Sequence, residues 1–311
     1  MSRTRLFALA ATTAIVVAVG IVLWLRAGAT APAAVPAPLP GAQAYRTPHY
    51  TVSSTATAAQ TARVGTAVEA LHAAFLKHFA LPPTPGPRLH LVLYRDRDQF
   101  KANNTSSPWA EAFYRRPACH AYVAEGANPY HWMLHEATHQ LAVEVMGLRK
   151  RRWLDEGLAA YFGVARIEHG VLVPGTFGKD AYPIWWLASV QLDADVERDI
   201  AAGRLIPLRA LITDTGPPIG QHVNQYYVEY WSLTQFLFHY DGGRYAAGYR
   251  RLIASNGRLE DFERLIGPVE AVQREWHGYL RTLAQAQRER EARAPATATS
   301  DATEEPVILL D

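Results

Sequence analysis

Two histidines four positions apart constrain this chain more than any other feature. His135 and His139 enclose Glu136 in the segment His-Glu-Ala-Thr-His, and Glu156 follows His139 by seventeen residues. Each residue of a helix turns by roughly 100°, so side chains four positions apart lie about 40° from each other around the axis, one turn apart. Both imidazoles can therefore reach one ion. The spacing predicts a helix that carries a metal site.

The residue types of this segment indicate zinc. Catalytic zinc sites combine three protein ligands with one open position, whereas structural sites are closed by four. We expect His135, His139 and Glu156 to bind Zn²⁺, and Glu136 to take a proton from a water on the ion. The alternative is two core histidines bonded to the backbone, but unpartnered imidazoles are costly on a buried helix. The sequence therefore favours a zinc hydrolase.

The segment around these histidines has residues typical of the two ends of a helix. Asn128 suits an N-cap, Pro129 suits the first helical position, and Gly147 suits the C-terminal stop. The residues between them are apolar enough for a largely buried helix. We predict that the helix runs from near Asn128 to Gly147.

A second motif carries a resemblance to a known family. The segments His135–His139 and Trp153–Gly157, the latter reading Trp-Leu-Asp-Glu-Gly, resemble those of the gluzincin zinc peptidases, in particular the bacterial peptidase MA-like domains. The resemblance implies a zincin-like metallopeptidase fold and a shorter second helix whose glutamate, here Glu156, is the third ligand. It also implies that the substrate is a peptide or protein.

The family commonly supplies a tyrosine from a later helix to stabilise the oxyanion. Tyr227 fits that helix pattern best, with Tyr226 and Tyr230 as rivals and His222 as a weaker candidate. Aromatic core packing is the alternative for each tyrosine. Thermolysin-like relatives place an acid one turn after the ligand glutamate, where this chain has Ala160. Asp155 could orient a histidine ligand instead, although a first-turn acid serving the helix dipole is the favoured interpretation.

Two further expectations concern the substrate. In the resembled peptidases, the strand before the zinc helix pairs with extended substrate by edge-strand addition. The range Cys119–Val123 corresponds to that strand. The Gly-x-Met-Glu-Asn element of aminopeptidases is absent upstream of His135. This absence favours an endopeptidase. Aromatic residues in Tyr182–Trp186 are expected to belong to the core more than to a substrate pocket.

The order of predicted elements indicates an α+β fold. A small sheet-bearing half comes first, a mainly helical half follows, and the active-site cleft is expected between them. The predicted strands are Tyr50–Ser54, Leu89–Tyr94 and Cys119–Val123, with a hairpin at Ile167–Val173. The predicted helices are Ala58–Phe79, a short one from near Asp96, Leu154–Val164, Ile184–Ala194, Val223–Tyr240, Arg244–Ala254 and Val269–Gln285.

The two ends of the chain differ from its middle. Leu6–Leu25 is uncharged and follows Arg3 and Arg5, which predicts a signal anchor that spans the membrane within residues 1–26. An Ala/Pro linker is expected at 27–44, the catalytic domain at 45–285 and a disordered tail at 286–311. The body of the protein would be extracytoplasmic, periplasmic or extracellular, and cleavage within the linker would release a secreted form.

Charge and cysteine content exclude some alternatives. The formal net charge is only +2, so the composition gives no electrostatic case for nucleic-acid binding. Cys119 is the only cysteine, which excludes an intramolecular disulfide, and it is expected to be buried. The competing functional hypothesis is a non-catalytic zinc-binding module for protein binding or envelope assembly. A second alternative is a metal-free helical scaffold. The oligomeric state is left open by the sequence.

Overall fold

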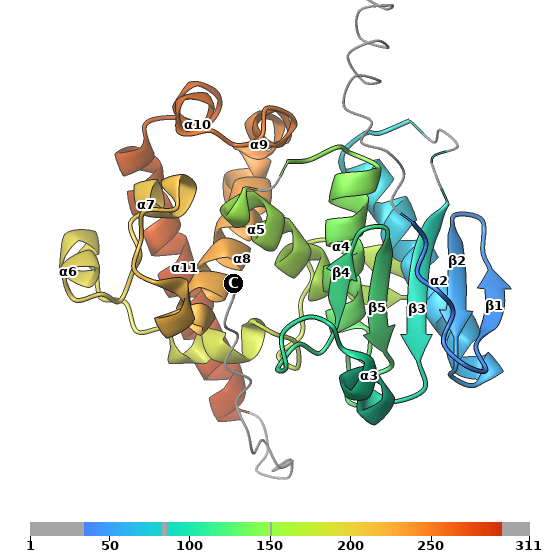
Figure 1. The fold of residues 1–311 in the computed structure, drawn as a ribbon. Helices are drawn as coiled ribbons and strands as arrows, with labels where there is room; N and C mark the ends of the chain where they lie inside the picture. Colours follow the sequence, from blue (N-terminus) through green and yellow to red (C-terminus); the bar gives the residue numbers. More distant parts are fainter. Residues whose placement is uncertain (1–33, 83–85, 87, 150, 294–311) are drawn as a thin grey trace, which may run out of the picture. The chain divides into compact units, whose positions relative to one another are not determined.

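A five-stranded mixed sheet forms the first half of the protein. The computed structural model describes residues 34–82, 86, 88–149 and 151–293 (Figure 1). The strand order is β1-β2-β3-β5-β4, in which the two central pairs are parallel and the two outer pairs are antiparallel. The strands are β1 (Gln43–Arg46), β2 (Tyr50–Ser54), β3 (Leu89–Tyr94), β4 (Phe113–Arg115) and β5 (Ala118–Tyr122).

Helices cover both faces of this sheet. The helices α2 (Ala58–His78) and α4 (His131–Glu144) pack on one face, and α3 (Arg97–Asn103) packs on the other (Figure 1). Alternation along β3 explains the division, because successive side chains of a strand point to opposite faces. Leu91 and Leu93 join the main core, whereas Val92 joins a smaller cluster with Phe100 of α3. The helix with the paired histidines therefore lies directly against the sheet.

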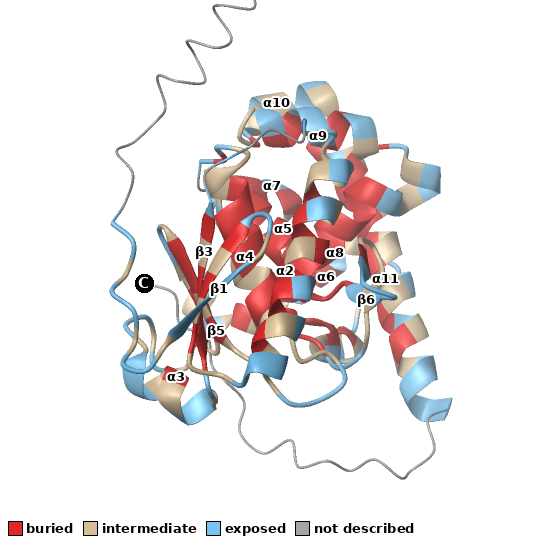
Figure 2. Cartoon of the chain, turned by 90° about the vertical axis from the view of Figure 1, so that its right-hand side faces the viewer, coloured by how far each residue is buried: buried red, intermediate tan, exposed pale blue. Residues whose placement is uncertain are grey.

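The second half is mainly helical, which confirms the α+β class. Its elements are α5 (Arg152–Gly163), the hairpin β6 (Arg166–Glu168) and β7 (Val171–Val173), α6 (Val196–Ala201), α7 (Leu208–Thr213), α8 (Val223–His239), α9 (Ala246–Ala254), α10 (Leu259–Leu265) and α11 (Val269–Arg293). Three short 3₁₀ segments, η1 (Ile184–Ser189), η2 (Ile219–Gln221) and η3 (Tyr240–Gly243), complete it. Helix α5 packs on both α4 and α8 and is almost entirely buried (Figure 2).

Two expectations about the metal-site region are wrong. The helix begins at His131, not near Asn128, because the Asn128 carbonyl accepts from the His131 ring and the Pro129 carbonyl accepts from Ala124 N–H. The strand before this helix, β5, is not an edge strand. It lies between β3 and β4, so the edge belongs to the three-residue strand β4.

Other boundaries also differ from the prediction. The helix expected at Ile184–Ala194 is the shorter η1, because Arg288 of α11 donates to the Val190 carbonyl at 2.6 Å and holds the chain extended there. Strand β1 begins within the expected linker, and α11 continues beyond Gln285 to Arg293 with Gln287 2% exposed. The remaining helices and the hairpin lie close to their predicted ranges, and Cys119 is buried as expected.

The predicted membrane span at Leu6–Leu25 lies outside the described residues, as do the first part of the predicted linker, 27–33, and the tail from residue 294. Within the described ranges, none of the helices combines the length and the apolar character that crossing a membrane requires.

Candidate metal centre

Three side chains predicted as ligands converge between α4 and α5. Nε2 of His135 lies 3.3 Å from Oε2 of Glu156, and Nε2 of His139 lies 3.6 Å from the same oxygen. Two ligand atoms about 2.0–2.1 Å from a tetrahedral zinc ion are separated by roughly 3.3–3.5 Å. The separations in the protein therefore suit one zinc ion held by all three residues.

The surroundings of Glu156 fit a bound cation. Its Oε2 atom is buried and has no hydrogen-bond partner among the described residues. A buried carboxylate oxygen without a hydrogen bond is costly, and a metal ion in this position would satisfy it. The side chains of His135, His139 and Glu156 are only 12–14% exposed, so a metal here would be largely shielded from bulk water.

Asp155 orients one of the histidines. Nδ1 of His139 donates to Oδ1 of Asp155 at 2.8 Å, which leaves Nε2, on the side of Glu156, as the nitrogen that can bind a metal ion. Burial alone would lower the pKa of His139, but the Asp155 and Glu156 carboxylates raise it well above its ordinary value. The same negative field attracts a cation. Asp155 is also in the first turn of α5, so the favoured helix-end interpretation describes only part of its role.

Two glycines allow α5 to approach both neighbouring helices. A Cβ atom on Gly163 would lie 3.1 Å from Cβ of His135, and one on Gly157 would lie 2.4 Å from Oγ1 of Thr234 in α8. Any larger residue would push the helices apart. The glycine of the Trp-Leu-Asp-Glu-Gly segment therefore has a packing role: it keeps the part of α5 that carries Glu156 close to α8.

Glu136 is half-buried beside the converging ligands and contacts the sheet edge. The backbone N–H of Tyr114 in β4 donates to Oε2 of Glu136 at 2.8 Å. Burial raises the pKa of Glu136, and His139 and His135 partly oppose that shift. Because Tyr114 N–H points away from β5, strand alternation also directs the Tyr114 carbonyl away from β5, toward the side of the site.

The three candidate tyrosines of α8 have different surroundings. The Tyr227 ring stacks on His135 at 6.2 Å between centroids, and burial together with Glu156 raises its pKa well above the ordinary value. The Tyr226 hydroxyl donates to the Pro217 carbonyl at 2.8 Å. Tyr230 is fully buried, with its hydroxyl unpartnered among the described residues. Of the three, Tyr227 is the one that packs against a predicted ligand.

Aromatic residues form an apolar wall next to Tyr227. Tyr182 packs between Tyr227, at 5.3 Å, and Trp132, at 5.6 Å, and Trp109 and Trp186 border the same cluster. Tyr182 is 4% exposed. The segment Tyr182–Trp186, which was expected to belong to the core, thus contributes both to the core and to the wall of the site.

Two contacts of the site join elements that are distant in the chain. The bond from Tyr114 depends on the position of β4, which is too short to show a periodic pattern. The role of Asp155 depends on the packing of α5 on α4. His222 immediately precedes α8, and its side chain makes no hydrogen bond or ring contact within the described part of the chain, so nothing links it to the metal centre.

Comparisons with protein-family models, with curated proteins and with solved structures find no match to this chain.

Proposed function

We propose that this protein is a zinc-dependent hydrolase of peptide bonds, with a zincin-like fold of the gluzincin kind. The observation that carries the proposal is the convergence of His135, His139 and Glu156 on one point, with Glu136 beside them. The order of a small sheet, two helices with the metal ligands and a helical half agrees with that of the resembled peptidases. The buried Oε2 of Glu156, which accepts no hydrogen bond within the described residues, supports the presence of a cation.

A zinc ion at this position would supply Lewis acidity and lower the pKa of a bound water toward neutrality. Glu136 would act as the general base, taking the proton of the attacking water and passing it to the leaving amine. A pKa raised by burial suits this task near neutral pH, because a base works best when its pKa lies near the working pH. The hydrogen bond from Tyr114 N–H orients the carboxylate.

Tyr227 would stabilise the oxyanion that forms on the substrate carbonyl. Burial and the nearby Glu156 raise its pKa, so its hydroxyl keeps its proton and can donate it in a hydrogen bond. The aromatic wall around Tyr182 would exclude water from the reacting atoms. Asp155 would keep His139 in the tautomer that binds the metal.

The exposed edge of β4 supports a peptide substrate. An extended peptide can add to an edge strand through backbone hydrogen bonds, and the Tyr114 carbonyl is directed to the side of the site. This role moves from β5, where the resemblance assigned it, to β4. We also propose that the enzyme acts outside the cytoplasm, anchored by residues 1–26, and we infer this from Arg3, Arg5 and the uncharged segment that follows them.

Replacing Glu136 by Gln tests the hydrolase proposal. The variant keeps the ligands, so it should bind zinc like the wild type while digestion of casein or a peptide library slows by about 10²–10⁴-fold. Glu125→Gln, on an exposed loop, is the matched control and should leave the rate unchanged. If Glu136→Gln and the wild type digest equally, or neither digests while both contain zinc, the non-catalytic zinc-binding module is the better description.

A further inference from the structure

A second group of metal-binding side chains lies between the β1–β2 turn and α2. His49 ends the turn, and Glu69 and His72 are three residues apart on α2, so they share one face of the helix. Their candidate ligand atoms all lie within 4.8 Å of one another. The three residues come from a part of the chain that the proposed hydrolase does not use.

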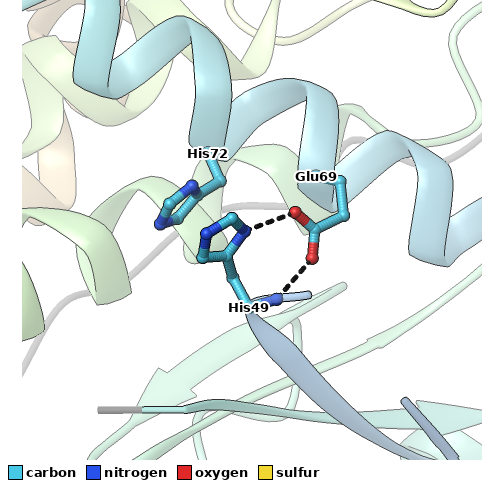
Figure 3. Close-up of side chains that lie close together, drawn as sticks. All are labelled: His49, Glu69 and His72. Carbon is cyan, nitrogen blue, oxygen red and sulfur yellow. Dashed lines mark hydrogen bonds and ion pairs between the residues drawn. The ribbon is translucent and has the colours of Figure 1, made fainter. Parts of the chain in front are cut away.

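Glu69 orients His49 in the way that carboxylates orient metal-binding histidines. It accepts from the backbone N–H of His49 at 2.8 Å and from Nδ1 of His49 at 2.7 Å (Figure 3). Because a carboxylate only accepts, Nδ1 carries the proton and Nε2 of His49 has a free lone pair. A histidine that gives its other ring proton to a carboxylate is the usual arrangement at zinc sites.

His72 supplies a second imidazole directly beside the first. The two rings stack with their centroids 3.8 Å apart, and the His49 ring lies between Glu69 and His72 (Figure 3). His72 is 7% exposed, and within the described residues its ring makes only ring contacts, with His49 and Tyr50. Because no side chain or backbone group of the described residues hydrogen-bonds to the His72 ring, its nitrogens are available to a metal ion.

The geometry requires only a small adjustment to bind an ion. Ligand atoms around zinc lie roughly 3.3–3.5 Å apart, closer than the outer limit of 4.8 Å here. The side chain of His49 is 44% exposed at a turn, so its ring has room to shift relative to His72, which is fixed on the helix. Glu69 also ties the turn to α2 through Thr47 and His49, a structural role that explains the carboxylate but not the second imidazole.

We propose that His49 and His72, supported by Glu69, form a second, exchangeable site for a late first-row divalent cation such as zinc. Imidazole with carboxylate is the donor set that such ions prefer. An ion bound there would join the β1–β2 turn to α2, so micromolar zinc should raise the midpoint of thermal unfolding by mass action. The site is independent of the hydrolytic centre, because it shares no residue with it.

Zinc titration of the full chain tests this inference. The chain is first dialysed against a chelating resin that leaves only tightly held metal, and zinc uptake is then followed with a competing chromophoric chelator. The wild type should take up about one further equivalent, and His72→Phe, which keeps the stacked ring but loses the ligand atom, should take up none. His49→Asn, at an exposed position, should lose the same equivalent without loss of folding.

His169→Asn is the matched control, because His169 is exposed at the β6–β7 turn with φ of 51°, a conformation that asparagine tolerates. It should bind as much zinc as the wild type. The inference is wrong if the wild type takes up no further zinc, or if His49→Asn and His72→Phe both take up as much as the wild type. Neither result bears on hydrolysis, which is measured separately.

Discussion

Asp155 should set the strength of metal binding at the hydrolytic centre. Its carboxylate accepts from Nδ1 of His139 at 2.8 Å and is 11% exposed, so the bond is both charge-assisted and shielded. Loss of such a supporting partner typically weakens metal binding by about 10–100-fold, which is about 1.4–2.7 kcal/mol. Asp155→Asn keeps an acceptor oxygen but loses the charge, so we expect this variant to bind zinc about tenfold more weakly than the wild type. Asp155→Ala loses both the oxygen and the charge, so we expect it to bind zinc about 100-fold more weakly than the wild type.

The zinc affinity of each variant can be measured by competition with a chromophoric chelator at fixed pH. Asp98→Asn is the matched control, since Asp98 is an exposed first-turn acid of α3 that touches no ligand. It should change zinc affinity less than about twofold, although each first-turn acid can contribute about 0.3–1 kcal/mol to helix stability. The reasoning fails if Asp155→Ala binds zinc as tightly as the wild type, or if Asp98→Asn weakens binding equally.

Four other substitutions have defined outcomes. Tyr227→Phe should lower kcat about 10²-fold with zinc retained, whereas Tyr226→Phe should change kcat little; equal losses would contradict the assignment. Asp199→Asn should lower the free energy of unfolding, measured in urea at pH 7, by about 3 kcal/mol, because fully buried Asp199 pairs with His277 at 2.7 Å. Burial raises the pKa of Asp199, but its hydrogen bonds lower the pKa by more, so this stabilisation is lost as the pH falls through the folded pKa. Burial raises the pKa of Glu229 to about 8. The free energy of unfolding of the wild type should therefore fall, relative to that of Glu229→Gln, by about 1.4 kcal/mol per pH unit between pH 5 and 8. Parallel plots of unfolding free energy against pH for the two proteins would refute this.

Local periodicity explains which parts of the fold could be predicted. Strands β2 and β3 have their predicted ends, and α2 and α8 end within one residue of theirs, because side-chain alternation and helical spacing repeat over many residues. The His-Glu-Ala-Thr-His spacing is equally local, since four residues along a helix suffice to bring two imidazoles together. The position of Glu156 required the second motif and its resemblance to a family.

Contacts between distant elements explain what could not be predicted. Strand β4 has three residues, so neither its existence nor its place at the sheet edge could be inferred, and the edge was assigned to β5. The short helices α6, α7 and α10 contain too few turns for a periodic signal. Glu69 and His72 come together with His49 only because α2 packs beside the β1–β2 turn, about twenty residues away in the chain.

The zinc content of the purified full chain tests the central claim most directly. After dialysis against a chelating resin, elemental analysis of the wild type should give about one tightly bound zinc per chain, and the double variant His135→Ala/His139→Ala should give less than about a tenth of that. A folded double variant, judged by circular dichroism, makes the comparison valid. Less than about half an equivalent of zinc in the wild type, or equal zinc in both proteins, would contradict the proposed metal centre.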